Sequence, residues 1–339
     1  MKAALLYTGE QSLKVENIAN PTVPKGWALV KVRAAGVCGT ELHFLVDGLM
    51  PLAKSPFILG HEIAGEVVEV PEGTGFKKGD RVSIYNLVNC GHCSYCRAGL
   101  DSLCPNATGQ FGFNLDGGFA EYVTVPPTSL VHLPDKVSFN DGAILACSGM
   151  TAVHAVKMAD IGFRDTVVVN GVGGVGLAVG QVAKNTGARV LAIADTQEKA
   201  DLAKKLFADE VVITKDYSNV AEDIKKLTDG NGVDAFFELV GTAASANAGL
   251  NSLAKRGRYV IIGYTKDHVD LDPILMVIYE LRIMASVAGT KQDLEDVLKL
   301  CEQGKVKVFV QSELKLDDVN VALEKLKNRT SLGRNVIVF

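Results

Sequence analysis

Four of the chain's seven cysteines lie within 15 positions, with two residues between each of the first three and seven before the last: Cys90, Cys93, Cys96 and Cys104. Four thiolates can surround Zn²⁺ tetrahedrally and leave no open position, which is the composition of a structural zinc site. Clustered cysteines in a chain of this length indicate metal or redox chemistry rather than a disulfide framework. Zinc is our preferred hypothesis, and an iron–sulfur cluster or a redox dithiol is the alternative.

A second set of metal-binding residue types is dispersed along the chain: Cys38, His61 and Cys147. Two thiolates and one imidazole with an open fourth position form a catalytic zinc composition. Each residue alone also fits a structural role, because a free cysteine packs as a small hydrophobe and a single histidine is commonly buried without a metal. Since sequence separation does not place the three side chains together, both interpretations stay open at this point.

A glycine-rich segment, residues 171–176, reads Gly-Val-Gly-Gly-Val-Gly and matches the G-x-G-x-x-G pattern. It follows a valine-rich stretch and precedes a predicted helix, which is the context that this dinucleotide-binding motif requires. The glycines allow a tight turn and let backbone N–H groups approach a pyrophosphate. We therefore predict cofactor contacts at Gly171, Gly173, Gly174, Val175 and Gly176.

Asp195 follows the next predicted strand, 24 positions after Gly171. A carboxylate there accepts hydrogen bonds from ribose hydroxyls and repels a 2′-phosphate, which favours NAD over NADP. Two alternatives stay open, because Asp195 can cap the following helix, and Thr196 and Lys199 can help to bind a phosphate. Lys199 is therefore a further candidate cofactor-binding residue.

The elements that must position these residues change character near residue 150. Before it, short β-branched runs such as 27–32 and 63–68 are separated by Gly, Pro and Asp turns, which predicts a β-rich domain. After it, strand-like runs from 166–169 to 258–262 alternate with helical stretches, which predicts an α/β domain with a doubly wound parallel sheet.

Length and composition bound the class of protein. A chain of 339 residues suggests about two domains, and 47% hydrophobic with 22% charged residues excludes disorder. The net charge of −4 and the lack of a basic cluster argue against nucleic acid as a partner. No apolar run approaches a membrane span and no signal peptide is recognisable, so we expect a cytoplasmic protein with no membrane partner.

These motifs, in this order, resemble those of the zinc-containing alcohol dehydrogenases of the medium-chain dehydrogenase/reductase family. The resemblance runs essentially from end to end. It covers segments 36–43, 60–65, 79–82 and 117–122, the four-cysteine segment, the glycine-rich segment and a late Gly-Thr pair at 289–290.

The resemblance implies a GroES-like β-rich catalytic domain, residues 1–148 and 290–339, and a Rossmann NAD-binding domain, residues 149–289. The active site would lie in the cleft. The resemblance also implies that Cys38, His61 and Cys147 bind a catalytic zinc, and that the four clustered cysteines bind a structural one. The implied cofactors are two Zn²⁺ per chain and NAD.

The resemblance further assigns roles to single residues. Glu62 would assist ligand exchange at the metal. The proton of the alcohol would leave through Thr40, a cofactor ribose hydroxyl and His43, whose imidazole titrates in the working range. Arg334 would approach the cofactor pyrophosphate. A cysteine at position 147 is typical of the alcohol-dehydrogenase branch, whereas the polyol-dehydrogenase branch commonly has a carboxylate there.

Three positions depart from the family pattern. Asn86 stands near where an aromatic residue often lines the substrate pocket, so we include it among the candidate pocket residues. Phe207 stands where a glycine commonly ends a helix, and the sequence offers no reason for it. Glu41 stands where aspartate is frequent, a change that we expect to matter little.

The resulting hypothesis is a zinc-dependent enzyme that reversibly oxidises a small-molecule alcohol to an aldehyde or ketone and transfers hydride to NAD. The polar Asn86 keeps open a polyol, threonine-type or hydroxyacyl-thioester dehydrogenase on the same scaffold. More distant alternatives are a zinc-free quinone or enoyl reductase and a non-catalytic NAD-binding sensor. The family resemblance implies a homodimer or a homotetramer.

Overall fold

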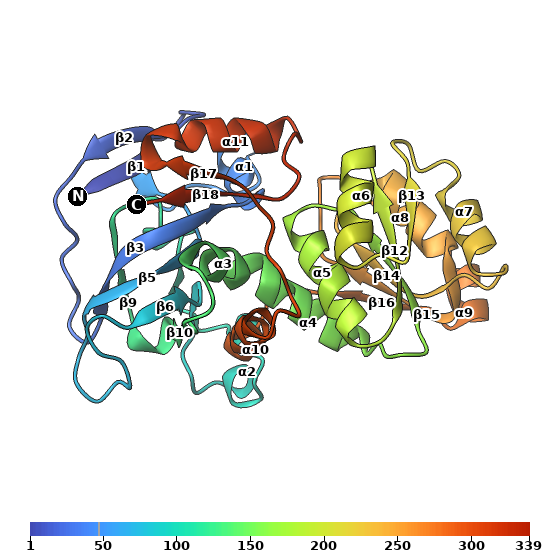
Figure 1. The fold of residues 1–339 in the computed structure, drawn as a ribbon, viewed down its shortest axis with the longest axis horizontal. Helices are drawn as coiled ribbons and strands as arrows, with labels where there is room; N and C mark the ends of the chain where they lie inside the picture. Colours follow the sequence, from blue (N-terminus) through green and yellow to red (C-terminus); the bar gives the residue numbers. More distant parts are fainter. Residues whose placement is uncertain (47) are drawn as a thin grey trace. The chain divides into compact units, whose positions relative to one another are not determined.

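The computed structural model describes residues 1–46 and 48–339 and divides them into two compact units (Figure 1). Unit 1 comprises residues 1–150, 290–303 and 308–339, and unit 2 comprises residues 151–289 and 304–307. The sequence places residues 304–307 in the catalytic domain with the rest of 290–339, whereas the structure places them in unit 2. The cause is local, because the Gln181 side chain hydrogen-bonds both the N–H and the carbonyl of Lys307, and Asn185 donates to the carbonyl of Lys305.

Unit 1 is a β-rich domain built on a seven-stranded sheet with the order β10-β6-β5-β3-β18-β17, in which β9 also pairs with β3. The strands of this sheet are β3 (Ala28–Val37), β5 (Glu62–Glu69), β6 (Arg81–Ile84), β9 (Tyr122–Val125), β10 (Leu130–His132), β17 (Val310–Lys315) and β18 (Arg334–Val338). Smaller sheets contain β1 (Lys2–Leu6), β2 (Lys14–Asn17) and β4 (Phe57–Ile58), and β7 (Leu87–Val88) and β8 (Gly109–Gln110).

Short helices and turns of unit 1 connect and cover these sheets. They are α1 (Thr40–Leu45), α2 (Ser94–Arg97), η1 (Asp101–Leu103), η2 (Pro127–Ser129), α3 (Phe139–Ile144), η3 (Leu145–Gly149), α10 (Lys291–Glu302), η4 (Leu316–Asp318) and α11 (Val319–Lys327). The core follows from the alternation along β3, where Val30 and Val32 are fully buried and Lys31 and Arg33 are not. Phe57, Phe119 and Ile63 fill the same core, which a chain of this composition can build without a disulfide.

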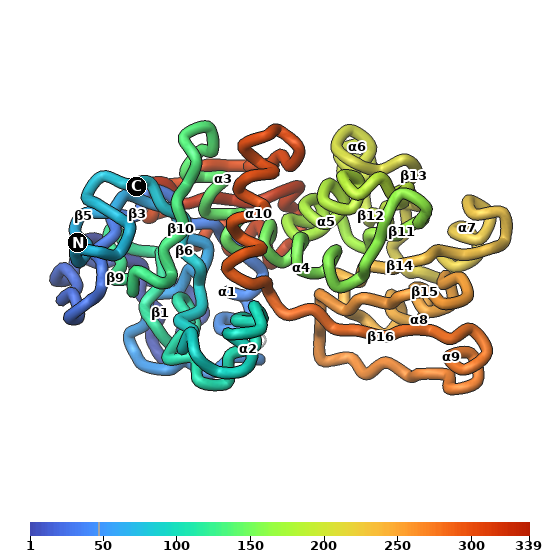
Figure 2. The backbone as a smooth tube through the Cα atoms, turned by 90° about the horizontal axis from the view of Figure 1, so that it is seen from below, coloured from blue at the N-terminus to red at the C-terminus, as the bar shows by residue number. Residues whose placement is uncertain are grey.

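Unit 2 is a doubly wound domain with a six-stranded, fully parallel sheet of order β13-β12-β11-β14-β15-β16. The strands are β11 (Thr166–Asn170), β12 (Arg189–Ala194), β13 (Glu210–Ile213), β14 (Val233–Glu238), β15 (Leu253–Ile261) and β16 (Arg282–Ala285). The helices are α4 (Met150–Ala159), α5 (Gly174–Asn185), α6 (Gln197–Leu206), α7 (Val220–Leu227), α8 (Ala243–Asn251) and α9 (Pro273–Tyr279). Helices α5 and α6 pack together, as do α7 and α8. Figure 2 shows strands β11, β12 and β14 lying between α5 on one side and α7 on the other. The predicted fold class is confirmed.

The unexpected Phe207 has a packing role in unit 2. It follows α6 and is buried, and its ring lies where a side chain on Gly180 of α5 would have to go, since a Cβ there would stand 2.3 Å from the ring. An aromatic residue after α6 is therefore matched by a missing side chain on α5, which lets the two helices pack closely.

Residues 139–159 form the one helical run in the described part of the chain that is long and apolar enough to cross a membrane. Its apolar window is 78% buried inside the protein. Burial of this kind is what a core helix shows, so the run is weak support for a membrane span.

Candidate functional site

The candidate metal residues of unit 1 converge because three neighbouring strands meet at one edge. Strand β3 runs antiparallel to both β5 and β18, so the end of β3 lies beside the start of each partner. Cys38 directly follows β3, His61 and Glu62 stand at the start of β5, and Arg334 opens β18. Residues up to about 300 positions apart in sequence are thereby brought to one place.

Cys147 completes this group from a helix. It lies in the middle of η3, a π-helical segment between α3 and α4. A π segment widens the helix by one residue per turn and is frequent at functional sites. Ligand atoms of Cys38, His61, Glu62 and Cys147 all lie within 4.8 Å of one another, and His61 Nε2 is 3.3 Å from Cys147 Sγ.

Glu41 is a site residue whose importance the sequence did not indicate. Its carboxylate lies 2.8 Å from His61 Nδ1 and accepts the backbone N–H of Cys38 at 2.7 Å. The residue is 1% exposed, although it sits on the short helix α1. A carboxylate on the second ring nitrogen of a metal-binding histidine fixes the ring's orientation and raises its basicity. The longer glutamate lets one side chain serve both Cys38 and His61.

Glu62 is fully buried and faces the guanidinium of Arg334 at 3.2 Å. Neither carboxylate oxygen of Glu62 has a hydrogen-bond partner among the described residues, and Arg334 Nε and Nη2 are also unsatisfied. Gly36 lies opposite Glu62 in the sheet, and a Cβ there would stand 1.9 Å from Glu62 Oε2. An unsatisfied buried carboxylate is costly, so this one marks a place where a further ligand or cation fits.

The electrostatics of the group favour a cation. Hydrogen bonding from Cys147 holds the pKa of the Cys38 thiol well below its usual value, and the same contact raises the pKa of Cys147. Burial raises the pKa of Glu62 to about 8, because desolvation outweighs the attraction of Arg334. Burial lowers the pKa of His61, but Glu41 and Cys38 more than offset it and the net pKa is raised. A metal ion binding here would displace protons from these groups.

Thr40 and His43 lie on α1, immediately after Cys38. Thr40 Oγ1 is 3.6 Å from Cys38 Sγ, so this hydroxyl stands at the edge of the candidate metal group. Residues three apart on a helix share a face, so His43 lies on the same side of α1 as Thr40. Both side chains are partly exposed, as a group that exchanges protons with solvent must be.

A hollow of about 370 Å³ lies in unit 1 near this group. Its apolar wall includes Phe44, Met50, Leu87 and Phe113, and its polar lining includes Gln110 and Asn114. The Phe113 ring packs against both Phe44 and His61, with ring centroids 5.9 and 5.4 Å away. The hollow is therefore one aromatic ring from a candidate metal ligand. Asn86, next to Leu87, is buried at 3% exposure, and its role in a pocket stays a prediction.

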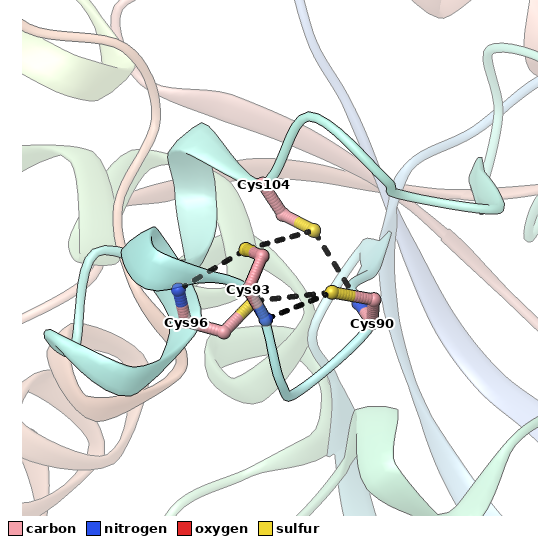
Figure 3. A group of neighbouring side chains, drawn as sticks. All are labelled: Cys90, Cys93, Cys96 and Cys104. Carbon is pink, nitrogen blue, oxygen red and sulfur yellow. Dashed lines mark hydrogen bonds between the residues drawn. The ribbon is translucent and has the colours of Figure 1, made fainter.

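The four clustered cysteines form a separate group in unit 1, and Figure 3 shows their side chains pointing toward one another. The sulfurs of Cys93 and Cys104 are 3.9 Å apart and those of Cys90 and Cys96 are 4.0 Å apart, too far for disulfides. Zn–S bonds of about 2.3 Å in a tetrahedron place the sulfurs about 3.8 Å apart, so this group fits one zinc ion.

Backbone geometry supports the four-cysteine group. The sulfurs of Cys90, Cys93 and Cys104 each accept a backbone N–H at 3.4 Å, which stabilises thiolates. Hydrogen bonds from the backbone of His92 and Cys93 lower the pKa of Cys90 to about 6. Gly91 and Gly99 both adopt φ of +73°, the left-handed conformation that glycine allows without strain.

The candidate cofactor residues lie in unit 2 at the start of α5. Gly171 directly follows β11 and has a φ of +105°, and a side chain on Gly176 would collide with the carbonyl of Gly171. Gly173 caps α5 without a side chain, so its first N–H groups stay available, as the motif requires. The positions of Gly174 and Val175 in the first turn of α5 agree with the pattern.

Asp195 follows β12, and its carboxylate does not cap α6. Thr196 caps this helix instead, accepting the N–H of Lys199. Asp195 is about half-exposed and forms an ion pair with Lys199 at 2.8 Å. The Lys199 ammonium is thus held by a carboxylate, and the Thr196 hydroxyl accepts the first-turn N–H of α6.

Comparison with known proteins agrees with this arrangement. Residues 24–135 match the family described as Alcohol dehydrogenase GroES-like domain, and residues 174–303 match Zinc-binding dehydrogenase. A protein of Sulfurisphaera tokodaii named NAD-dependent alcohol dehydrogenase is 34% identical, with both chains covered completely. The chain belongs to the zinc-containing alcohol dehydrogenases. It is therefore an enzyme of the NAD-dependent alcohol dehydrogenase class, and the predicted family is confirmed.

Solved structures show the same fold. The alcohol dehydrogenase of Aeropyrum pernix is 34% identical, with a TM-score of 0.92 and complete coverage of both chains. The D-arabinose dehydrogenase of Sulfolobus solfataricus is 31% identical, with a TM-score of 0.84 over 100% of this chain and 99% of its own. Proteins named for different substrates therefore share this fold.

The space that Gly36 leaves for Glu62 can be tested directly. We expect Gly36→Ala to lower the thermal midpoint by several degrees, because the added methyl overlaps the buried Glu62 carboxylate and overpacking costs about 1–3 kcal/mol. Gly39→Ala is the matched control, since a Cβ there meets nothing within 4 Å. Equal thermal midpoints for the two variants in differential scanning fluorimetry would contradict the packing described.

Proposed function

We propose that the chain oxidises an alcohol to an aldehyde or ketone reversibly, using a zinc ion held by Cys38, His61 and Cys147 and hydride transfer to NAD. The observation that carries this proposal is the convergence of two thiols, an imidazole and an unsatisfied buried carboxylate within 4.8 Å. Three protein ligands with room for a fourth group is the composition of a catalytic zinc site.

Cys38, His61 and Cys147 would hold the catalytic zinc, and Glu41 would orient His61 toward it. When bound, zinc would act as a Lewis acid on the substrate oxygen and NAD would accept the hydride. Glu62 lies beside Arg334 and has no hydrogen bond to either carboxyl oxygen, which suits a group that assists ligand exchange. The clustered cysteines would hold a second, structural zinc, giving two Zn²⁺ per chain.

Thr40 and His43 would move the substrate proton. The Thr40 hydroxyl stands 3.6 Å from Cys38 Sγ, close enough to the ligand group to accept the proton of an alcohol bound there. His43, which is partly exposed on the same helix, would carry that proton on toward solvent.

In unit 2 the glycine turn would bind the pyrophosphate of NAD, and Asp195 would bind the adenosine ribose. The pairing of Asp195 with Lys199 supports NAD over NADP, because Lys199 is held by a carboxylate that a 2′-phosphate would have to displace. Arg334 would contact the pyrophosphate with the part of its guanidinium that does not face Glu62.

The hollow lined by Phe113, which is one aromatic ring from His61, favours an alcohol with an apolar group. Aromatic and aliphatic side chains form much of its wall, and its two lining amides can orient one polar group of a substrate. A polyol would leave most of its hydroxyls against apolar surface, which costs free energy. The similarity to a protein named D-arabinose dehydrogenase keeps a polyhydroxylated substrate, such as a polyol, as the second candidate. Gln110 and Asn114 would be its polar contacts.

The proposal includes a homodimer or homotetramer in the cytoplasm. Strand β16 is an edge strand with β15 as its one neighbour in the described sheet. Helix α9 of the same unit exposes Ile274, Val277 and Ile278 at 64–76%. Exposed apolar side chains near an open sheet edge favour association with a second copy. Light scattering that gives the 36.1 kDa mass of one chain would contradict it.

Zinc analysis of cysteine variants tests the two metal sites separately. We expect about two zinc ions per chain in the native protein, with Cys38→Ser losing about one together with activity. Cys93→Ser should lose the other. Cys301→Ser, which alters a cysteine outside both groups, is the control and should keep both. Retention of both ions by Cys38→Ser, measured by elemental analysis, would remove the catalytic assignment.

The substrate preference can be tested with alcohols of similar size and different polarity. In the native protein we expect kcat/KM for 1-phenylethanol to exceed that for a pentitol by about tenfold or more. We expect Phe113→Ala to lower kcat/KM for 1-phenylethanol about tenfold, because the variant removes apolar area from the wall of the hollow. Phe163→Ala changes a phenylalanine that is 75% exposed in unit 2 and serves as the control. A preference for the pentitol would favour the polyol alternative.

The choice of cofactor depends on Asp195. We expect Asp195→Ala to lower the ratio of kcat/KM for NAD to that for NADP by about tenfold or more, because the repelling carboxylate is lost and Lys199 is freed. Asp201→Ala, which removes a carboxylate of α6 that bonds Gln197, is the control. An unchanged ratio in steady-state kinetics would show that Asp195 does not select the cofactor.

A further inference from the structure

Glu238 is a buried acidic residue to which the proposed mechanism assigns no role. It is the last residue of β14 in unit 2 and is 1% exposed. Its carboxylate accepts hydrogen bonds from the Asn170 side chain at 3.0 and 3.1 Å, from the backbone N–H groups of Val240 and Gly241 at 2.6 and 2.9 Å, and from the Tyr259 hydroxyl at 3.1 Å. These hydrogen bonds fix the position of the Glu238 carboxylate.

The hydrogen-bonding pattern is that of an ionised carboxylate. Every neighbour donates, and the backbone N–H groups cannot accept a proton in return. Among residues 1–46 and 48–339, no Lys, Arg or His forms an ion pair with Glu238. Burial and then the charge of Glu238 raise the pKa of Tyr259, as expected beside a negative charge. A buried charge held only by neutral dipoles is expensive and projects its field to its surroundings.

The position of Glu238 in the sheet connects it to the cofactor. The strand order reverses between β11 and β14, and dinucleotides bind outside the carboxyl ends of strands at such a switch point. Glu238 ends β14 and its partner Asn170 ends β11, directly before Gly171. Val240, held by Glu238, lies 3.1 Å from where a Cβ of Gly171 would stand. The carboxylate therefore fixes the loop that abuts the cofactor turn.

We propose that Glu238 sets the charge preference of the cofactor site, favouring NAD⁺ over NADH. The inference rests on the proposed binding of NAD by unit 2. The nicotinamide ring of NAD⁺ carries a positive charge that it loses on accepting hydride, so a fixed negative charge nearby stabilises the oxidised form more than the reduced one. Glu238 acts on the cofactor through its field and through the loop at 239–241, and it is a positioning residue in that sense.

Two effects of Glu238 can be separated by comparing the two redox forms. Loss of loop geometry would weaken the binding of NAD⁺ and NADH alike, because the two forms share the adenosine and the pyrophosphate. Loss of the charge would weaken NAD⁺ selectively. The ratio of the two dissociation constants therefore reports the charge alone, which a purely structural role would leave unchanged.

The experiment measures the dissociation constants of NAD⁺ and NADH for the full-length, zinc-loaded protein by calorimetry and NADH fluorescence. We expect Glu238→Gln to raise the ratio Kd(NAD⁺)/Kd(NADH) about fivefold or more. Glu238→Asp keeps the charge and shortens the side chain, so both constants should rise while their ratio stays within about twofold. Glu222→Gln, which neutralises an exposed carboxylate on α7 of the same unit, is the control.

An unchanged ratio in Glu238→Gln would overturn the proposal. Glu238→Ser, a second neutral variant that leaves room for water, is made in parallel. If neither neutral variant can be recovered folded while Glu238→Asp can, the carboxylate is needed for folding stability and the proposal is likewise overturned. Failure of the native protein to bind either redox form would instead contradict the proposed function, so the two failures are distinguishable.

Discussion

The antiparallel pairing of β3 with both β5 and β18 is the constraint on which the candidate metal centre depends. This pairing places the end of β3 beside the beginnings of its two partners, so Cys38, His61 and Arg334 meet without any loop having to carry them. A register slip of one residue would turn Glu62 to the opposite face of the sheet. Gly36 secures the register from the other side, because only glycine leaves room for the Glu62 carboxylate.

The buried ionisable groups of the candidate metal centre stabilise one another, so they have to be considered together. Glu41 and Glu62 are each about 1% exposed or less, and beside them lie two thiols, one of which is acidified by the other. Arg334 balances Glu62, and Glu41 holds His61. Because isolated buried charges are strongly unfavourable, a negative group of this size is consistent with selection for a cation. Metal binding at this group would therefore be coupled to stability, as in other sites whose ligands must be deprotonated.

Local pattern predicted much of the fold and little of the side-chain network. The alternation of β3, the parallel strands after residue 150 and the cysteine spacing are properties of short segments, and the structure contains these strands and brings those cysteines together. The pairing of Glu62 with Arg334 joins residues 272 positions apart, and no local pattern encodes it. The packing of Phe207 on Gly180 and the contacts of Glu41 likewise depend on distances through space.

The two units hold their buried acids in different ways, and the difference matches what each is proposed to bind. In unit 1, Glu62 faces a guanidinium and keeps both oxygens free of hydrogen bonds, so its lone pairs stay available. In unit 2, Glu238 is saturated by neutral donors, so its lone pairs are used and its charge is not cancelled. Free lone pairs suit exchange of a ligand at a metal, whereas an uncancelled charge acts at a distance on a cofactor whose own charge changes during the reaction.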